Sequence, residues 1–167
     1  MEGMGAHPHG LESAFDRKNP LLQVGRLEAR HESAWRQLWQ SYLAFYGVEL
    51  EDAVTANTWR MMVAPKSPTI GLGAECKGEL LGFAHIIVHE RTWTLGPTAY
   101  LEDLYVTEEA RGCGIGGSLI RATLAMGRKR NWSSLYWHTR SDNGRARALY
   151  DGFAKADEFV RYRVSLP

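Results

Sequence analysis

Hydrophobic residues change their spacing several times along the chain, and each change predicts a new element. The pattern over 21–29 is typical of a strand, whereas apolar residues recur every three or four positions over 31–46, as on one face of a helix. A second helix is predicted over 51–63, before two strands at 69–77 and 80–89 that Gly78 and Glu79 connect as a hairpin. The first helix carries an apolar stripe of Trp35, Leu38, Trp39, Tyr42 and Phe45.

The second half of the chain predicts a strand over 99–106, a glycine-rich turn, a helix, a strand over 134–139, a capped helix and a last strand over 159–164. Simple alternation along 99–106 places Tyr100, Glu102, Leu104 and Val106 on one face. It places Leu101, Asp103 and Tyr105 on the other. The element order is that of a mixed α/β (α+β) domain without an internal repeat.

Length and charge limit the classes of protein that fit. The 167 residues suit a single domain over 21–167, preceded by a flexible tail at 1–20 that lacks the apolar core of a signal peptide. Lys and Arg number 20 against 19 acidic residues, so we expect neither a nucleic-acid nor a membrane partner. The distant Cys76 and Cys113 are expected to be reduced thiols of a cytoplasmic protein. His85 and His89 share a strand face, but no third ligand has metal-site spacing, so we expect no metal.

The turn between the strand at 99–106 and the helix after it contains four glycines, at 112, 114, 116 and 117. A turn with so few side chains lets backbone N–H groups approach a ligand, while the following helix directs its positive end to the same place. Phosphate suits such a site, so the turn predicts an anion cradle.

Three motifs around this turn resemble those of the GNAT superfamily of acyl-CoA-dependent N-acetyltransferases. They are Tyr-Leu-Glu-Asp-Leu-Tyr-Val at 100–106, Arg-Gly-x-Gly-Ile-Gly at 111–116, and Asn143 followed by Ala-Arg-Ala-Leu-Tyr at 146–150. Within the superfamily they are most similar to the polyamine and histone/polyamine acetyltransferase branch. The resemblance implies a mixed, mostly antiparallel central sheet flanked by helices, with a splay between the two central parallel strands.

The resemblance also implies which residues hold acetyl-CoA, the expected co-substrate. The glycine turn would bind the pyrophosphate of coenzyme A, and the strand before it would pair with the amides of the pantetheine arm. Asn143 would contact the cofactor or fix its own helix. The expected cofactor-binding set is Leu104, Tyr105, Val106, Arg111, Gly112, Cys113, Gly114, Ile115, Gly116, Gly117 and Asn143.

By the same resemblance, two side chains are expected to move protons. A protonated amine cannot attack a thioester, so Glu102 would remove a proton as general base, directly or through water, and Tyr150 would protonate the leaving sulfur. Asp103 competes with Glu102: one of the two is the base, and the other anchors a loop or the substrate ammonium. Tyr46 and Glu49, with Asp103, would favour a cationic amine.

The expected reaction is direct transfer of an acetyl group from acetyl-CoA to a primary amine, on a polyamine-like small molecule or a protein lysine, in a ternary complex. A homodimer is the expected assembly. Two other classes stay open. One is a non-catalytic acyl-CoA-binding or sensing module. The other is a dinucleotide-dependent oxidoreductase, whose fingerprint Gly112-x-Gly114-x-x-Gly117 matches, although 137–139 lacks the acidic residue that holds ribose.

Overall fold

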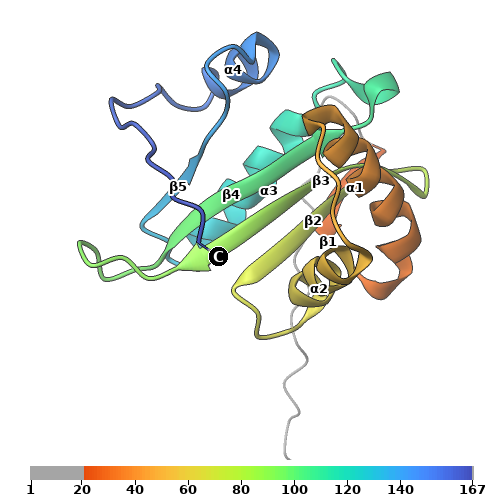
Figure 1. The fold of residues 1–167 in the computed structure, drawn as a ribbon, viewed down its shortest axis with the longest axis horizontal. Coiled ribbons are helices and arrows are strands. Elements are labelled where there is room, and N and C mark those ends of the chain that lie inside the picture. Colours follow the sequence, from red (N-terminus) through yellow and green to blue (C-terminus); the bar gives the residue numbers. More distant parts are fainter. Residues whose placement is uncertain (1–20, 167) are drawn as a thin grey trace, which may run out of the picture.

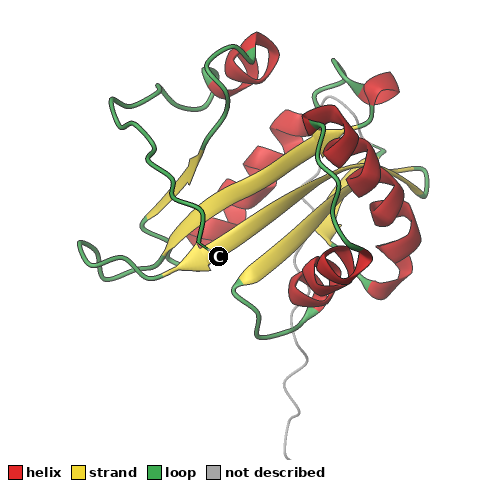
Figure 2. Ribbon diagram, in the orientation of Figure 1, coloured by secondary structure: helices red, strands yellow, loops and turns green. Residues whose placement is uncertain are grey.

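A computed structural model describes residues 21–166, so the tail expected at 1–20 lies outside the described residues. One mixed sheet has helices on both faces (Figures 1 and 2). None of the helices within 21–166 is long and apolar enough to cross a membrane. The elements are β1 Leu22–Arg26, η1 Ala29–His31, α1 Glu32–Tyr46, α2 Asp52–Val63, β2 Thr69–Cys76, β3 Glu79–His89, β4 Thr98–Val106, η2 Glu108–Ala110, α3 Ile115–Lys129, β5 Ser134–Trp137 and α4 Gly144–Tyr150.

The sheet has the order β1-β2-β3-β4-β5, with antiparallel pairs from β1 to β4 and a parallel pair between β4 and β5. The expected mixed and mostly antiparallel sheet is therefore confirmed. The hairpin between β2 and β3 turns at Lys77 and Gly78, whose φ angles are 52° and 84°, rather than at Gly78 and Glu79. Two successive positive φ angles match the right-handed twist of the flanking strands.

Each face of the sheet has its own hydrophobic core. α3 inserts Ile115, Leu119 and Ile120 against one face, where Leu72 and Ile86 also lie. α1 and α2 cover the other face (Figure 1), and they bury a cluster that is rich in aromatic rings. This cluster includes Trp35, Leu38, Trp39, Trp59, Met62, Phe83 and Tyr105. The stripe predicted on α1 is thus buried at its start, whereas Phe45 at its end is 60% exposed.

The last expected strand is absent: residues 159–164 form neither a strand nor a helix. Val160, Tyr162 and Val164 keep the alternating pattern of a strand, but these three residues and the adjacent Phe159 are all exposed. Period-two alternation predicts a strand only where a sheet edge pairs with it, and in residues 21–166 this segment pairs with no edge. β5 is therefore an edge strand of the described sheet, as β1 is at the other end.

A glycine lets β3 and β4 approach closely, and its replacement should lower stability. A Cβ on Gly82 would lie 2.6 Å from the main-chain oxygen of Tyr105, which cannot move aside without opening the ladder. Gly82→Ala should therefore reduce the free energy of unfolding by about 1–3 kcal/mol, measured by urea denaturation. Gly25→Ala is the matched strand control, because a Cβ there meets nothing within 4 Å. Equal effects of the two variants would contradict the prediction.

Candidate active site

The glycine turn leads directly into α3 and leaves its first amides open. Gly112 and Gly114 have φ angles of 85° and 81°, and a Cβ on either would meet nothing within 4 Å. The first intrahelical bond runs from the Ser118 N–H to the Gly114 oxygen at 3.0 Å. The three amides at 115–117 therefore have no acceptor within the helix, and they lie at its positive end. This geometry suits an anion.

Arg111 ties the turn to the end of β4. Its Nε donates to the Val106 oxygen at 3.1 Å, and its guanidinium pairs with Glu108 at 2.7 Å. The same guanidinium lies over the ring of Tyr105, 5.7 Å from the centroid. The Arg111 side chain thus stabilises the connection between β4 and the turn. Cys113, within the turn, is an exposed free thiol.

The strand before the turn loses one of its two neighbours. β5 pairs with β4 only from Thr98 to Leu101, whereas β3 stays paired with β4 as far as Val106. Beyond Leu101, the edge of β4 that faces β5 has no strand partner among residues 21–166. The predicted splay is therefore present, and the main chain of Leu104, Tyr105 and Val106 lies along it.

A β-bulge lies at Glu102, where the splay begins. Leu101 pairs with Ile86 and Asp103 with His85, so Glu102 is an extra residue without a partner on β3. Simple alternation therefore fails. Leu101 packs in the α3 core together with Leu104 and Val106, whereas Asp103 and Tyr105 lie on the α1 side. The bulge reverses the alternation expected from the sequence, because one added residue moves every later side chain to the other face.

Glu102 is exposed, and within residues 21–166 no side chain is hydrogen-bonded to its carboxyl. Partial desolvation raises the pKa of this carboxyl above its ordinary value, the charge of Asp103 raises it further, and Arg161 acts in the opposite direction. The Tyr100 hydroxyl, also on β4, has a raised pKa because of its burial and then the charge of Glu102. A carboxylate with a raised pKa and no bound donor is a better proton acceptor than an ordinary surface carboxylate.

Asp103, by contrast, is fully engaged. The Tyr42 hydroxyl of α1 donates to its Oδ1 at 2.6 Å, and Nδ1 of His85 on β3 lies 2.8 Å from its Oδ2. Trp35 Nε1 donates to the opposite ring nitrogen of His85, Nε2, at 3.0 Å. Because an indole N–H can only donate, Nε2 of His85 accepts, and its Nδ1 carries the proton donated to Asp103. Four side chains thus form one hydrogen-bonded chain.

α4 carries the remaining expected residues, Asn143 and Tyr150. Asn143 caps the helix, because its Oδ1 accepts from the Ala146 N–H at 3.1 Å. Tyr150 packs beside Trp137 with 5.4 Å between ring centroids, and burial followed by the nearby Tyr46 raises its pKa to about 12. Its phenol is therefore protonated at neutral pH, as a general acid must be.

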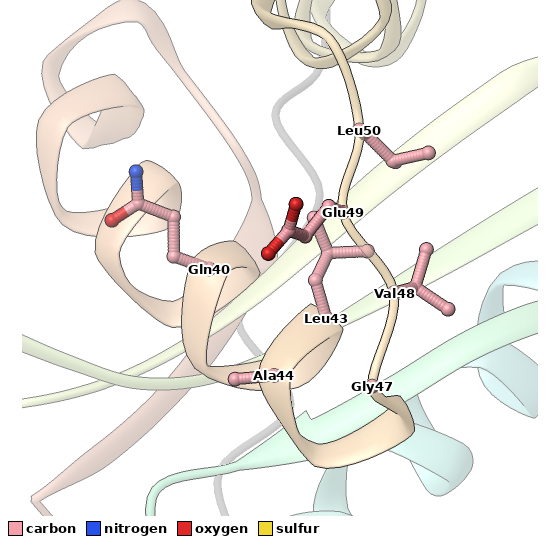
Figure 3. A pocket seen from close by; sticks show the side chains of 7 residues that line it. All are labelled: Gln40, Leu43, Ala44, Gly47, Val48, Glu49 and Leu50. Carbon is pink, nitrogen blue, oxygen red and sulfur yellow. The ribbon is translucent and has the colours of Figure 1, made fainter.

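Glu49 and Tyr46 lie near different hollows of the surface. Glu49 lines one between α1 and the segment leading to α2, with its carboxylate turned toward α1 (Figure 3). Tyr46 lines another with Phe45 and the start of α4, and its ring lies 5.0 Å from that of Tyr42. Of the three residues expected to bind the amine, Tyr46 and Asp103 are thus linked through Tyr42, whereas Glu49 lines a separate hollow.

Comparison with known proteins identifies the family. The model of the acetyltransferase (GNAT) family matches residues 32–153, a range that includes the splay, the glycine turn and α4. The chain is also 31% identical over 147 residues to a D-amino-acid N-acetyltransferase of Saccharomyces cerevisiae, covering 87% of this chain and 91% of that protein. The chain belongs to the GNAT family of acetyltransferases.

Solved structures share the fold of this GNAT acetyltransferase. A ribosomal-protein-alanine N-acetyltransferase from Brucella melitensis superposes with a TM-score of 0.74 at 23% identity, covering 87% of this chain and 99% of the other. An aminoglycoside acetyltransferase from an uncultured soil metagenomic sample gives a TM-score of 0.75 at 18% identity, covering 88% of this chain and 97% of the other. None of these three relatives is named for a polyamine or a histone, so the narrower branch stays a prediction.

Membership of the GNAT family confirms an acetyltransferase and excludes the oxidoreductase interpretation of the glycine turn. GNAT enzymes use acetyl-CoA, and the open amides at 115–117 fit a diphosphate because a Cβ at the neighbouring Gly112 or Gly114 would meet nothing within 4 Å. The roles of the individual site residues stay predictions.

Sequence reasoning missed the hydrogen-bonded chain that ends at Asp103. A signal was present: Trp35 and Tyr42 are seven residues apart and therefore share a helix face, and His85 is a polar residue inside the apolar run Gly-Phe-Ala-His-Ile-Ile-Val. The pairing of His85 with Asp103 depended on the bulge, which alternation along the strand did not predict.

Proposed function

We propose that this acetyltransferase transfers the acetyl group of acetyl-CoA to a primary amine that binds beside Glu102. One observation carries the proposal: the bulged carboxylate, the unpaired edge of β4 and the open amides at the start of α3 follow one another along a single stretch of chain, 102–117. A cofactor that lies along this stretch would have its pyrophosphate at the turn and its thioester near Glu102. Acetyl-CoA supplies the carbonyl carbon that the amine attacks.

Glu102 is the proposed general base, and Asp103 is not. Both oxygens of Asp103 are held by donors from α1 and β3, whereas the Glu102 carboxyl is open and has a raised pKa. A base must reach the ammonium proton of the amine, directly or through one water, and a carboxylate already bonded at both oxygens is poorly suited to this.

Tyr150 is the proposed general acid. Its hydroxyl holds a proton at neutral pH that a leaving thiolate can accept, and Asn143 fixes the start of the helix that carries it. The nearby Tyr46 and Tyr42, with Glu102 and Asp103, give the acceptor side an acidic and aromatic lining that favours a cationic amine. The acceptor is therefore proposed to enter as an ammonium ion, whether on a polyamine, an amino acid or a protein lysine.

Substitution of the two proposed proton carriers should reduce turnover. Glu102→Gln and Tyr150→Phe should each lower kcat/KM by about 10²- to 10⁴-fold, because each removes one proton transfer and leaves the binding surfaces in place. The measurement is release of free coenzyme A thiol over a panel of polyamines, diamines, D- and L-amino acids and lysine peptides.

Two results of this screen would contradict the proposal. Unchanged turnover in both variants would reject the catalytic assignments. Binding of acetyl-CoA without thiol release for any amine would support the sensing module instead.

The glycine turn offers a matched pair of variants for cofactor binding. Gly114 and Gly78 have φ angles of 81° and 84°, and a Cβ on either meets nothing within 4 Å. Alanine at either position is strained by about 1–2 kcal/mol, but only Gly114→Ala places a methyl group in the proposed cradle. By titration calorimetry, Gly114→Ala should raise the Kd for acetyl-CoA about tenfold or more, and Gly78→Ala should leave it unchanged. Equal affinities for the two variants would place the pyrophosphate elsewhere.

We also propose that the chain forms a homodimer, in which the exposed strand-like segment over 159–166 pairs with a second copy. Val160, Tyr162, Val164 and Leu166 are all exposed and alternate with polar residues, a pattern that is buried only when a sheet pairs with it. Light scattering should give a dimer for the wild type and a monomer for Val160→Asp/Val164→Asp. Ser165→Asp, on the polar side of the same segment, should stay dimeric. A monomeric wild type would contradict the proposal.

A further inference from the structure

The hydrogen-bonded chain Trp35–His85–Asp103–Tyr42 takes no part in the proton transfers proposed above. His85 is 2% exposed, and its ring is stacked on Phe83 with 4.5 Å between centroids. Its two nitrogens are both occupied, by the indole N–H of Trp35 and by the carboxyl of Asp103. A buried histidine of this kind has no access to substrate, so any effect on the reaction must act through another residue.

The tautomer of His85 follows from the hydrogen bonds at its two ring nitrogens. Because Nε2 accepts from the indole N–H of Trp35, Nδ1 carries the ring proton and donates to Asp103. Tyr42 is also a neutral donor, since burial followed by the charge of Asp103 raises the pKa of its hydroxyl well above the ordinary range. Asp103 therefore receives two hydrogen bonds that favour its ionised form, and neither comes from a cation.

An anion held in this way acts on its neighbours through its charge. The neighbour along β4 is Glu102, which the bulge leaves without a partner on β3. We propose that His85 and Tyr42 hold Asp103 as an anion, and that this charge sets the pH at which the neighbouring Glu102 becomes a base. His85 and Asp103 are then positioning residues, and the inference rests on the proposed role of Glu102.

The groups facing the two carboxyls define what else contributes. Glu102 interacts with Asp103 on its own strand and with Arg161 of the C-terminal segment, and its own charge acts on Tyr100. Asp103 faces Tyr42 on α1 and His85 on β3. Arg161 is the single cation in this group and favours ionisation of Glu102, whereas Asp103 opposes it. Removal of the Asp103 charge should therefore make Glu102 a carboxylate at lower pH.

The experiment measures kcat/KM against pH, whose ascending limb reports the free-enzyme base. Asp103→Asn should move this limb to lower pH by about one unit, since a neighbouring like charge is removed. His85→Phe should move it in the same direction by a smaller amount, because Asp103 loses one of the two hydrogen bonds that stabilise its charge.

A conservative variant separates charge from packing. His85→Asn keeps an amide N–H near the position of Nδ1 and can still donate to Asp103, although it leaves part of the ring's space empty. Both His85 variants should lower the free energy of unfolding. His85→Asn should nevertheless keep the ascending limb of the pH profile within about 0.2 pH unit of the wild type. A purely structural His85 would lower kcat in both variants without moving the limb in either, and that result would overturn its positioning role.

A second readout does not depend on turnover. Carboxyl ¹³C NMR of protein labelled at glutamate Cδ follows the ionisation of Glu102, with its signal assigned by loss in Glu102→Gln. The signal should titrate at lower pH in Asp103→Asn and His85→Phe than in the wild type. An unchanged midpoint in Asp103→Asn would overturn the proposal. Absence of turnover with every amine, together with shifted midpoints, would reject the proposed function and keep the electrostatic inference.

Discussion

The site depends on the end of the β4–β5 pairing at Leu101. A strand inside a sheet has both its edges satisfied by neighbours, so it offers no main-chain groups to a ligand. Here β3 stays paired with β4 as far as Val106. Because β5 pairs with β4 only as far as Leu101, the opposite edge of β4 has no strand partner over 102–106 among residues 21–166. The glycine turn follows after η2 and leads into the open amides at the start of α3. Rigidity on one side and access on the other come from a single strand.

The bulge at Glu102 assigns two neighbouring carboxylates to different surroundings. Asp103 lies opposite His85 and receives donors from α1 and β3, whereas Glu102 stays open beside the splay. The extra residue leaves Glu102 without a partner on β3, so the two adjacent acids differ in their hydrogen bonding. That difference carries the choice of Glu102 as the proposed base.

Elements with strong local signals were predicted well. The helices expected over 31–46 and 51–63 and the helix expected after the glycine turn all depend on residues close in sequence, and the structure contains each of them as α1, α2 and α3. The strand over 159–164 failed for the opposite reason. Its alternating pattern is local, but a strand also needs an edge to pair with, and residues 21–166 provide none for it.

The sequence by itself determined the family, the order of most of the elements and the glycine turn that leads into α3. These follow from short-range spacing, which backbone sterics and helix periodicity translate directly into structure. Only the tertiary structure decided how the side chains of β4 are distributed between its faces, because a one-residue bulge is set by the register against β3. It alone joined Trp35, Tyr42, His85 and Asp103, since contacts between α1, β3 and β4 arise from packing rather than from any pattern along one segment.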